Sequence, residues 1–130
     1  MKRTLGLTLL LFATLFSCMR QEKPLPAELS RAESVMWEHP DSALSILRSM
    51  PQSSLSSGKN YATWALLLAQ ARDKVYGKRL PDSLNIPSSD KLVQDAMDYF
   101  EKEGNLKRMA QTYYYKGQLL KDQKKITEAM

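Results

Sequence analysis

The sequence YATWALLLAQARDKVYG, residues 61–77, decides the fold because it is the most apolar of the helical segments in the chain. Its apolar residues recur at intervals of three and four, which predicts an α-helix over residues 59–76. Gly77 is a natural helix stop. The large apolar side carries Trp64, Leu67, Leu68 and Ala71, and an adjoining small-residue stripe carries Ala62, Ala65 and Ala69. Small residues let helices approach closely, so we expect other helices to pack against this one.

The segments on both sides have the same helical spacing, and proline and glycine separate them. The predicted helices cover residues 26–37 and 40–50, then a segment from Ser88 or Ser89 to the glycine at position 104, then residues 106–123. We expect PQSSLSSGK, residues 51–59, to be a polar loop. DQKK, residues 122–125, is expected to form a turn, after which ITEAM, residues 126–130, begins a sixth helix. No run alternates between apolar and polar residues as a strand would, so the sequence predicts an all-α fold.

The composition is that of one small folded domain, with 130 residues of which 43% are hydrophobic and 25% are charged. The net charge of +5 falls to +3 without residues 1–17, which contain Lys2 and Arg3. That bias is too weak for a nucleic-acid-binding surface, which concentrates basic residues on one face. The single cysteine excludes an intramolecular disulfide and a multi-cysteine metal site. We therefore expect no nucleic-acid partner, no metal and no cofactor.

The first 17 residues have the pattern of a secretory signal peptide. MKRT is a basic start, and residues 5–16 form an apolar run of about 12 residues, the length of a signal-peptide core. A spanning helix needs about 20 apolar residues, and charge returns at Arg20. A retained signal-anchor helix is the alternative, and it would be short.

LFSC, residues 15–18, contains the only cysteine and resembles a bacterial lipobox. Leu15 and the small residue Ser17 match that motif, whereas Phe16 is bulkier than the residue usual at its position. The resemblance implies cleavage between Ser17 and Cys18 and lipid attachment to the Cys18 sulfur and its new amino group. Each buried methylene contributes about 0.8 kcal/mol, so two or more acyl chains would hold the protein firmly at a membrane. Residues 18–25 would then be a tether; the alternative is an incidental cysteine.

A pair of residues four apart recurs in the second helix of each predicted helix pair. Ala43 precedes Leu47, Ala96 precedes Phe100, and Ala129 stands 33 residues after Ala96. The pattern resembles the tetratricopeptide repeat, whose first helix carries a large and then a small residue at the same spacing. The residues at those first-helix positions are Ala65, Ala69, Tyr113 and Gly117, of which Ala65 departs from the large residue of the repeat.

Together, LFSC, HPDSALSIL and YYYKGQLL resemble the lipid-anchored tetratricopeptide proteins common in Bacteroidetes. The resemblance implies that residues 26–130 form antiparallel helix pairs stacked as a short solenoid, with the last repeat incomplete. It implies a non-enzymatic scaffold or sensor-input module that docks an unidentified protein or peptide in the groove of its stacked first helices. The lipid anchor would place it in the cell envelope, at the outer membrane, on either the periplasmic or the outer side. An unrelated helical bundle is the alternative fold.

Two further functions compete with this interpretation. One is a small helical enzyme or ligand-binding bundle at the cell envelope. SSGK, residues 56–59, and SSDK, residues 88–91, have the Ser-x-x-Lys spacing of penicillin-binding enzymes, but the companion motifs Ser-Asp-Asn and Lys-Thr-Gly do not occur. The single histidine, His39, precedes a proline, where a cap or surface role is expected. The other is the truncated sensor part of a longer signalling or transcription-regulatory protein, because the sixth helix has barely begun at residue 130.

Three consecutive tyrosines, Tyr113 to Tyr115, cannot all face the core from one helix. Tyr113 fits the packing position of the repeat, so Tyr114 or Tyr115 would face the neighbouring helix or the concave surface. Exposed aromatic residues are typical binding anchors, which makes Tyr114 and Tyr115 candidates for a binding surface, with ordinary packing as the alternative. The lysines of KGQLLKDQKK, residues 116–125, predict a solvated face, and an acidic partner is the alternative.

Overall fold

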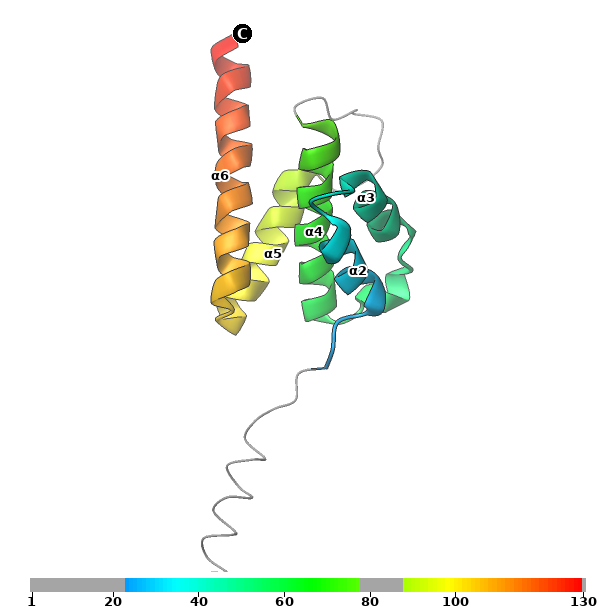
Figure 1. The fold of residues 1–130 in the computed structure, drawn as a ribbon. Coiled ribbons are helices and arrows are strands. Elements are labelled where there is room, and N and C mark those ends of the chain that lie inside the picture. The colour runs from blue at the N-terminus through cyan, green and yellow to red at the C-terminus, as the bar shows by residue number, and fades with distance from the viewer. Residues whose placement is uncertain (1–22, 78–87, 130) are drawn as a thin grey trace, which may run out of the picture.

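The computed structural model describes residues 23–77 and 88–129, which fold into helices joined by short connections (Figure 1). These two ranges contain no strand, which confirms the all-α prediction. The predicted signal peptide, Cys18, most of the tether and the connection over residues 78–87 lie outside the described residues. Within the described ranges, no helix combines the length and the apolar character that crossing a membrane requires.

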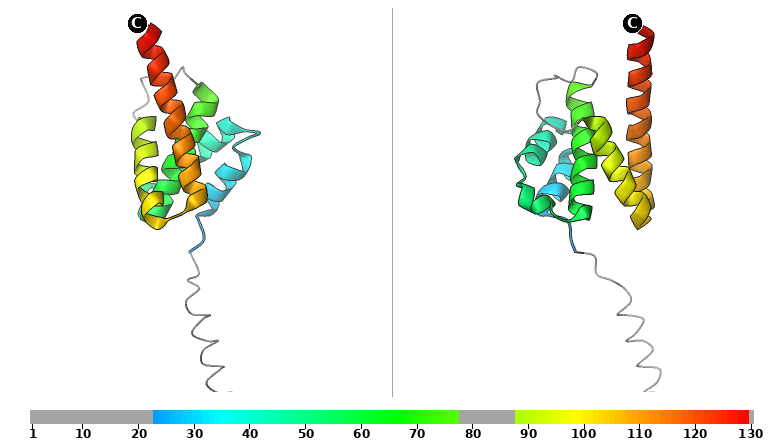
Figure 2. Two further views of the ribbon diagram at one scale, coloured as in Figure 1. Left: turned by 90° about the vertical axis from the view of Figure 1, so that its left-hand side faces the viewer. Right: turned by 180° about the vertical axis from the view of Figure 1, so that it is seen from behind.

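Five α-helices and one short 3₁₀ helix follow one another along the described chain. They are α2 (Ala27–Val35), α3 (Pro40–Ser49), the 3₁₀ helix η1 (Gln52–Leu55), α4 (Gly58–Tyr76), α5 (Ser89–Glu103) and α6 (Leu106–Ala129). The ends of α2, α3, α4 and α5 agree with the predicted ranges to within two residues. Consecutive α-helices run in opposite directions (Figures 1 and 2).

The central element is α4, which contacts α2, α3, α5 and α6. The pair α2 and α3 lies on one side of it, and the pair α5 and α6 lies on the other, with α6 outermost (Figure 2). Leu66, Leu67 and Leu68 on α4 are at most 1% exposed. Full burial of such a side chain contributes about 1.5–3 kcal/mol. The apolar character of α4 therefore makes it the helix around which the other four assemble.

Two side chains of α4 also make polar contacts with its neighbours. The Trp64 Nε1–H donates a hydrogen bond to the backbone oxygen of Leu47 in α3, at 2.8 Å. The Tyr61 hydroxyl donates to Asp95 Oδ2 in α5, at 2.9 Å. Both aromatic rings are half-buried, so each covers apolar surface while its polar tip is satisfied.

The helix ends follow the local sequence. Ser57 and Ser88 are N-caps, and their hydroxyl oxygens accept from the backbone N–H groups of Asn60 at 3.1 Å and Lys91 at 3.3 Å. Gly104 ends α5 with φ +76°, a left-handed conformation in which glycine is favoured. Its N–H donates to the Phe100 oxygen at 2.9 Å. This turn reverses the chain and starts α6 beside α5.

Two local predictions are wrong. Residues 52–55, expected in a polar loop, form η1, and Leu55 joins the core at 8% exposure. Residues 122–125, expected as a turn, continue α6, because the segment contains neither glycine nor proline and its Asp, Gln and Lys side chains are compatible with a helix. Ala129 therefore lies in the same helix as Tyr113, and the expected separate sixth helix does not form within the described chain.

Candidate functional site

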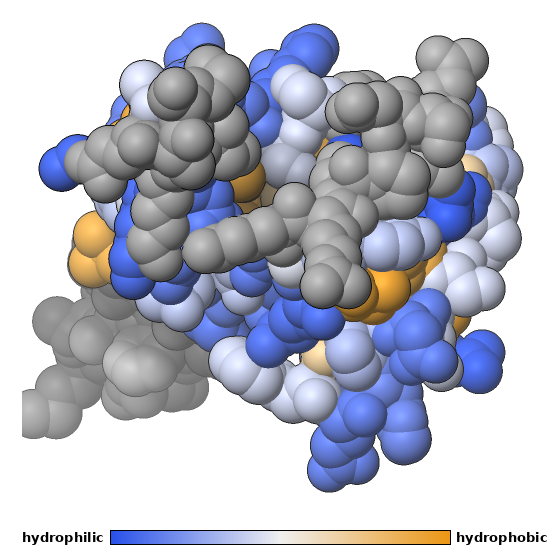
Figure 3. Space-filling model, turned by 90° about the horizontal axis from the view of Figure 1, so that it is seen from above, coloured by the Kyte–Doolittle hydropathy of each residue, from blue (hydrophilic) through white to orange (hydrophobic). Residues whose placement is uncertain are grey.

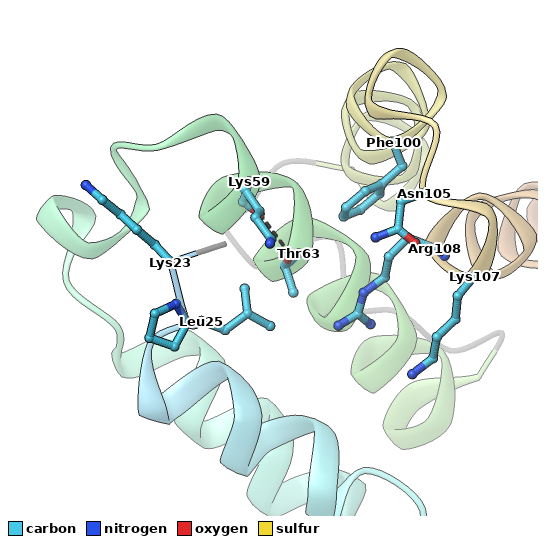
Figure 4. A pocket seen from close by; sticks show the side chains of 9 residues that line it. Lys23, Leu25, Lys59, Thr63, Phe100, Asn105, Lys107 and Arg108 are labelled. Atoms are coloured by element: carbon cyan, nitrogen blue, oxygen red, sulfur yellow. Dashed lines mark hydrogen bonds between the residues drawn. The ribbon is translucent and has the colours of Figure 1, made fainter. Parts of the chain in front are cut away.

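A pocket of about 330 Å³ lies at the end of the molecule where the chain enters α2 and where α6 begins (Figure 4). Segments that are far apart in the sequence form its walls. They are Lys23, Pro24 and Leu25 before α2, Lys59 and Thr63 in the first turns of α4, Phe100 near the end of α5, and Asn105, Lys107 and Arg108 at the start of α6. The pocket thus exists only because α2, α4 and α6 begin at the same end of the fold.

Arg108 is fixed at the edge of this pocket by an ion pair between α6 and α2. Its Nη1 and Nη2 atoms donate to the two carboxylate oxygens of Glu33 at 2.7 and 3.0 Å, and Nη1 also donates to Gln111 Oε1 at 3.1 Å. Two parallel bonds between a guanidinium and a carboxylate fix both orientations. The hydrogen bonds from Arg108 lower the pKa of Glu33, and partial burial opposes this shift. Glu33 is therefore a carboxylate at neutral pH.

Asn105 holds the first turn of α6 in place beneath the pocket. Its Oδ1 atom accepts from the backbone N–H of Arg108 at 3.1 Å, as an N-cap side chain does. This bond orients the helix start from which Lys107 and Arg108 project toward the pocket (Figure 4). The same end of α4 contributes Lys59 and Thr63, whose hydroxyl donates to the Lys59 oxygen at 2.8 Å.

The lining of the pocket is mostly cationic and polar. Four of the nine lining side chains are cationic, namely Lys23, Lys59, Lys107 and Arg108, and none of the nine is acidic. The one lining hydroxyl, on Thr63, donates to a backbone oxygen, and no lining side chain is a histidine, cysteine or carboxylate that could act as its base. Among the described residues, no group of His, Cys, Asp and Glu could hold a metal ion. The pocket can attract and orient a negatively charged group.

The three tyrosines of α6 have three different environments. Tyr113 and Tyr114 are exposed, at 51% and 59%, whereas Tyr115 is buried at 8%. The prediction that Tyr115 belongs to a binding surface is therefore wrong, because Tyr115 faces α4, where burial and the charge of Asp73 raise its pKa to about 12. Tyr113, expected in the packing position, points outward instead, and its hydroxyl donates to the Glu101 carboxylate.

The remaining residues of the predicted repeat divide into buried and exposed positions. Ala43, Leu47, Ala65, Ala69, Ala96 and Phe100 are at most 4% exposed. Gly117 is exposed on α6. The side chain of Ala129 lies outside the described residues. The small residues of α3, α4 and α5 are thus in the core, whereas the pair Tyr113 and Gly117 on the last helix lies at the surface.

The residues weighed for catalysis have ordinary structural roles. Ser88 caps α5, and Lys91 pairs with Asp95 at 2.8 Å one turn further on. His39 occupies the N-cap position of α3, is exposed, and makes no side-chain capping bond.

The sequence prediction did not group the pocket residues as a site; it placed Phe100 among the repeat-packing residues and Lys59 in the SSGK motif. One signal existed, because Asn105 stands directly before a predicted helix and is a good N-cap residue. The pairing of Arg108 with Glu33, 75 residues away, carries no local signal. Comparisons of the chain with protein-family models, curated proteins and solved structures find no match.

Proposed function

We propose that this protein is a lipid-anchored, non-enzymatic scaffold or sensor-input module that binds an acidic protein segment in a tetratricopeptide-like groove. The observation that carries the proposal is the charge of the pocket, whose lining has three lysines, Arg108 with its charge paired to Glu33, and no carboxylate. Negative charges on a ligand would be attracted by this cationic lining, which would raise the association rate of the ligand and orient it. The absence of a nucleophile with a base among the lining residues favours capture over turnover.

The order of the helix contacts supports a repeat-like groove. α2, α4 and α6 would be the first helices of three successive pairs, and α4 contacts both of the others. In stacked helix pairs, the first helices form one continuous surface that accepts extended or helical segments. The pocket lies at the end of this row of helices (Figure 4). A bound segment would follow the row and place its acidic residues at the pocket.

The proposed lipid anchor would limit the distance between the pocket and the membrane surface. Cys18 precedes Lys23 by five residues, and an extended chain covers at most about 3.6 Å per residue. A lipidated Cys18 would therefore hold the pocket within roughly 20 Å of the membrane surface. The ligand would be a segment of a membrane-associated protein or of one that can approach the membrane closely.

A titration of the purified full chain tests the proposal. The probe is a fluorescein-labelled peptide of about ten residues rich in Asp and Glu, and its control replaces every Asp with Asn and every Glu with Gln. We expect the acidic peptide to bind and the double substitution Lys23→Glu with Lys59→Glu to weaken it roughly tenfold or more. Lys102→Glu, an exposed charge reversal on α5 outside the pocket, is the matched control. Equal binding of both peptides, or an equal loss in the control variant, would refute the proposal.

A further inference from the structure

The outer face of α6 carries an apolar stripe that no described element covers. Leu106, Ala110, Tyr113, Gly117 and Leu120 follow each other at alternating intervals of four and three, so they share one side of the helix. All five are exposed, and the three large side chains are 77%, 51% and 52% exposed in chain order. The left view of Figure 2 looks onto this face, with α6 in front of the other helices.

Seen from above, most of the described residues are hydrophilic, and apolar residues appear in separate patches (Figure 3). Single exposed apolar residues need no explanation, whereas a continuous apolar row on one helix marks a contact surface. We call this row, residues 106, 110, 113, 117 and 120, the α6 seam.

Gly117 gives the α6 seam its shape. A Cβ atom added at this residue would meet no heavy atom within 4 Å, so no neighbour within the described fold requires a glycine there. Glycine in the interior of a helix destabilises it relative to alanine. Together with Ala110, about two turns away, it leaves hollows on either side of Tyr113. A second helix can approach closely over small residues while larger residues interlock.

The charges beside the α6 seam define the partner. Lys107, Tyr114 and Lys121 each directly follow a large residue of the seam and form one flank, and all three are exposed. Lys124 continues the seam toward the end of α6. On the opposite flank, Glu101 accepts the hydrogen bond from Tyr113. Asp90 pairs there with Lys116 at 3.5 Å, so both carboxylates are already engaged. The flank with Lys107 and Lys121 is therefore complementary to carboxylates on a partner.

The same charges disfavour a second copy of this chain. In an antiparallel pair centred on Tyr113, Lys107 of one copy would lie beside Lys121 of the other. In a parallel pair, Lys116 would lie beside Lys121. Like charges at these flanking positions are the usual means by which helix pairs exclude a partner.

We propose that the α6 seam binds an amphipathic helix that carries Asp or Glu beside its apolar side. A lipid surface is the less suitable occupant, because membranes take up protruding large apolar side chains, whereas the hollows at Ala110 and Gly117 match the ridge of a helix. The site is separate from the pocket in all but Lys107, which borders both. It therefore adds a second binding surface to the proposed scaffold.

The test uses the full chain and two synthetic helical peptides of about 21 residues, or three heptads. Both peptides have the same Leu and Ala seam, and the flanking positions are Glu in one and Lys in the other. We expect the Glu peptide to bind by fluorescence anisotropy and the Lys peptide to bind at least tenfold more weakly. Lys121→Glu should reduce this discrimination. Binding of the two peptides with equal affinity, or of neither, overturns the proposal.

Variants at Gly117 locate the binding surface. Gly117→Leu fills a hollow and should weaken the binding of the Glu peptide tenfold or more. Ser45→Leu, an exposed change in the middle of α3, should leave the affinity for the Glu peptide unchanged. Gly117→Ala should raise the thermal midpoint, which shows that the fold itself does not need the glycine. Unchanged binding by Gly117→Leu contradicts the proposal, as does loss of binding in the pocket variant Lys59→Glu. Cosedimentation with vesicles of phosphatidylglycerol that depends on Leu106 and Leu120, without peptide binding, would assign the seam to a membrane instead.

Discussion

Arg108 connects α6 to α2 through its ion pair with Glu33. At 8% exposure, its side chain is among the most buried charged groups in the described chain. Its guanidinium loses most of its water on folding, and the Glu33 carboxylate replaces that water with two short bonds. Removing one member of such a pair leaves the other buried without its counterion. The packing of α2 against α6 should therefore be destabilised more by a substitution of Glu33 than by a substitution of any exposed carboxylate.

We predict that Glu33→Gln lowers the free energy of unfolding by about 1–2 kcal/mol at neutral pH. The value is below that of a fully buried pair because a third of the Glu33 side chain is exposed. The pKa of Glu33 is lowered on folding, so its contribution is present above the ordinary value of 4.5 and is lost as the pH falls through the lowered pKa. Urea unfolding at about pH 7 and pH 3 should show the gap between wild type and variant closing in acid.

Glu38→Gln, a change at an exposed carboxylate, is the control for this experiment. It should alter the unfolding free energy by no more than about 0.5 kcal/mol. A constant difference between wild type and Glu33→Gln across the acid range would contradict the role given to the ion pair.

Gly104 is one of two described glycines with a positive φ, which is +76° at Gly104 and +55° at Gly77. A Cβ added at Gly104 would meet nothing within 4 Å, so the cost of a substitution comes from the backbone alone. We predict that Gly104→Ala destabilises the fold by about 1–2 kcal/mol. Gly117→Ala is the matched comparison, because that glycine also has open space but lies inside α6, and it should stabilise by about 0.5–1 kcal/mol. Thermal unfolding of both variants checks the opposite signs.

At the scale of elements, local sequence was sufficient for most helices. Serine caps, prolines and the glycine at position 104 determine where α3, α4 and α5 begin or end, and each acts over a few residues. The prediction failed at the end of α6 because a cluster of polar residues is compatible with both a turn and an exposed helix. Only the absence of glycine and proline after residue 117 favoured the helix.

The continuity of α6 can be tested with proline. Gln123→Pro would remove a helical hydrogen bond and place the proline ring against the preceding turn. We predict that this variant loses about one to two turns of helical circular dichroism while the core transition stays cooperative, since the side chains buried in α6 precede residue 120. Gln123→Ala is the control, because it also removes the bond from Gln123 to Asp90 at 2.7 Å. An unchanged spectrum for the proline variant would support a turn at residues 122–125.

At the scale of the whole molecule, the pocket and the α6 seam differ in how far the sequence could reveal them. The seam consists of residues in one helix, and two of them, Tyr113 and Gly117, were predicted from the sequence as packing positions of a repeat and not as a binding surface. The burial of Tyr115 in place of Tyr113 was not predicted, because it depends on the rotation of α6 against α4. The pocket combines side chains from Lys23 to Arg108, which only the packing of three helices brings together.

The proposed lipid anchor concerns the whole molecule, because it would orient both the pocket and the α6 seam relative to a membrane. The chain enters α2 at the pocket end, while α6 extends to the opposite end (Figure 1). A lipid on Cys18 would therefore hold the pocket near the membrane and direct the far end of the α6 seam away from it. A partner helix could reach the seam from solution while a membrane-associated segment occupied the pocket.

We predict that Cys18→Ser moves the protein from the membrane fraction to the soluble fraction of the cells that express it, because two or more acyl chains are needed for firm attachment. Intact-mass spectrometry of the wild type should show a chain that begins at Cys18 and carries the added mass of the lipid. Ser53→Ala, an exposed change in η1, should leave both the mass shift and the fractionation unaltered. A wild-type chain with an unmodified Cys18, or with residues 1–17 still attached, would remove the anchor and leave the orientation of the two surfaces undetermined.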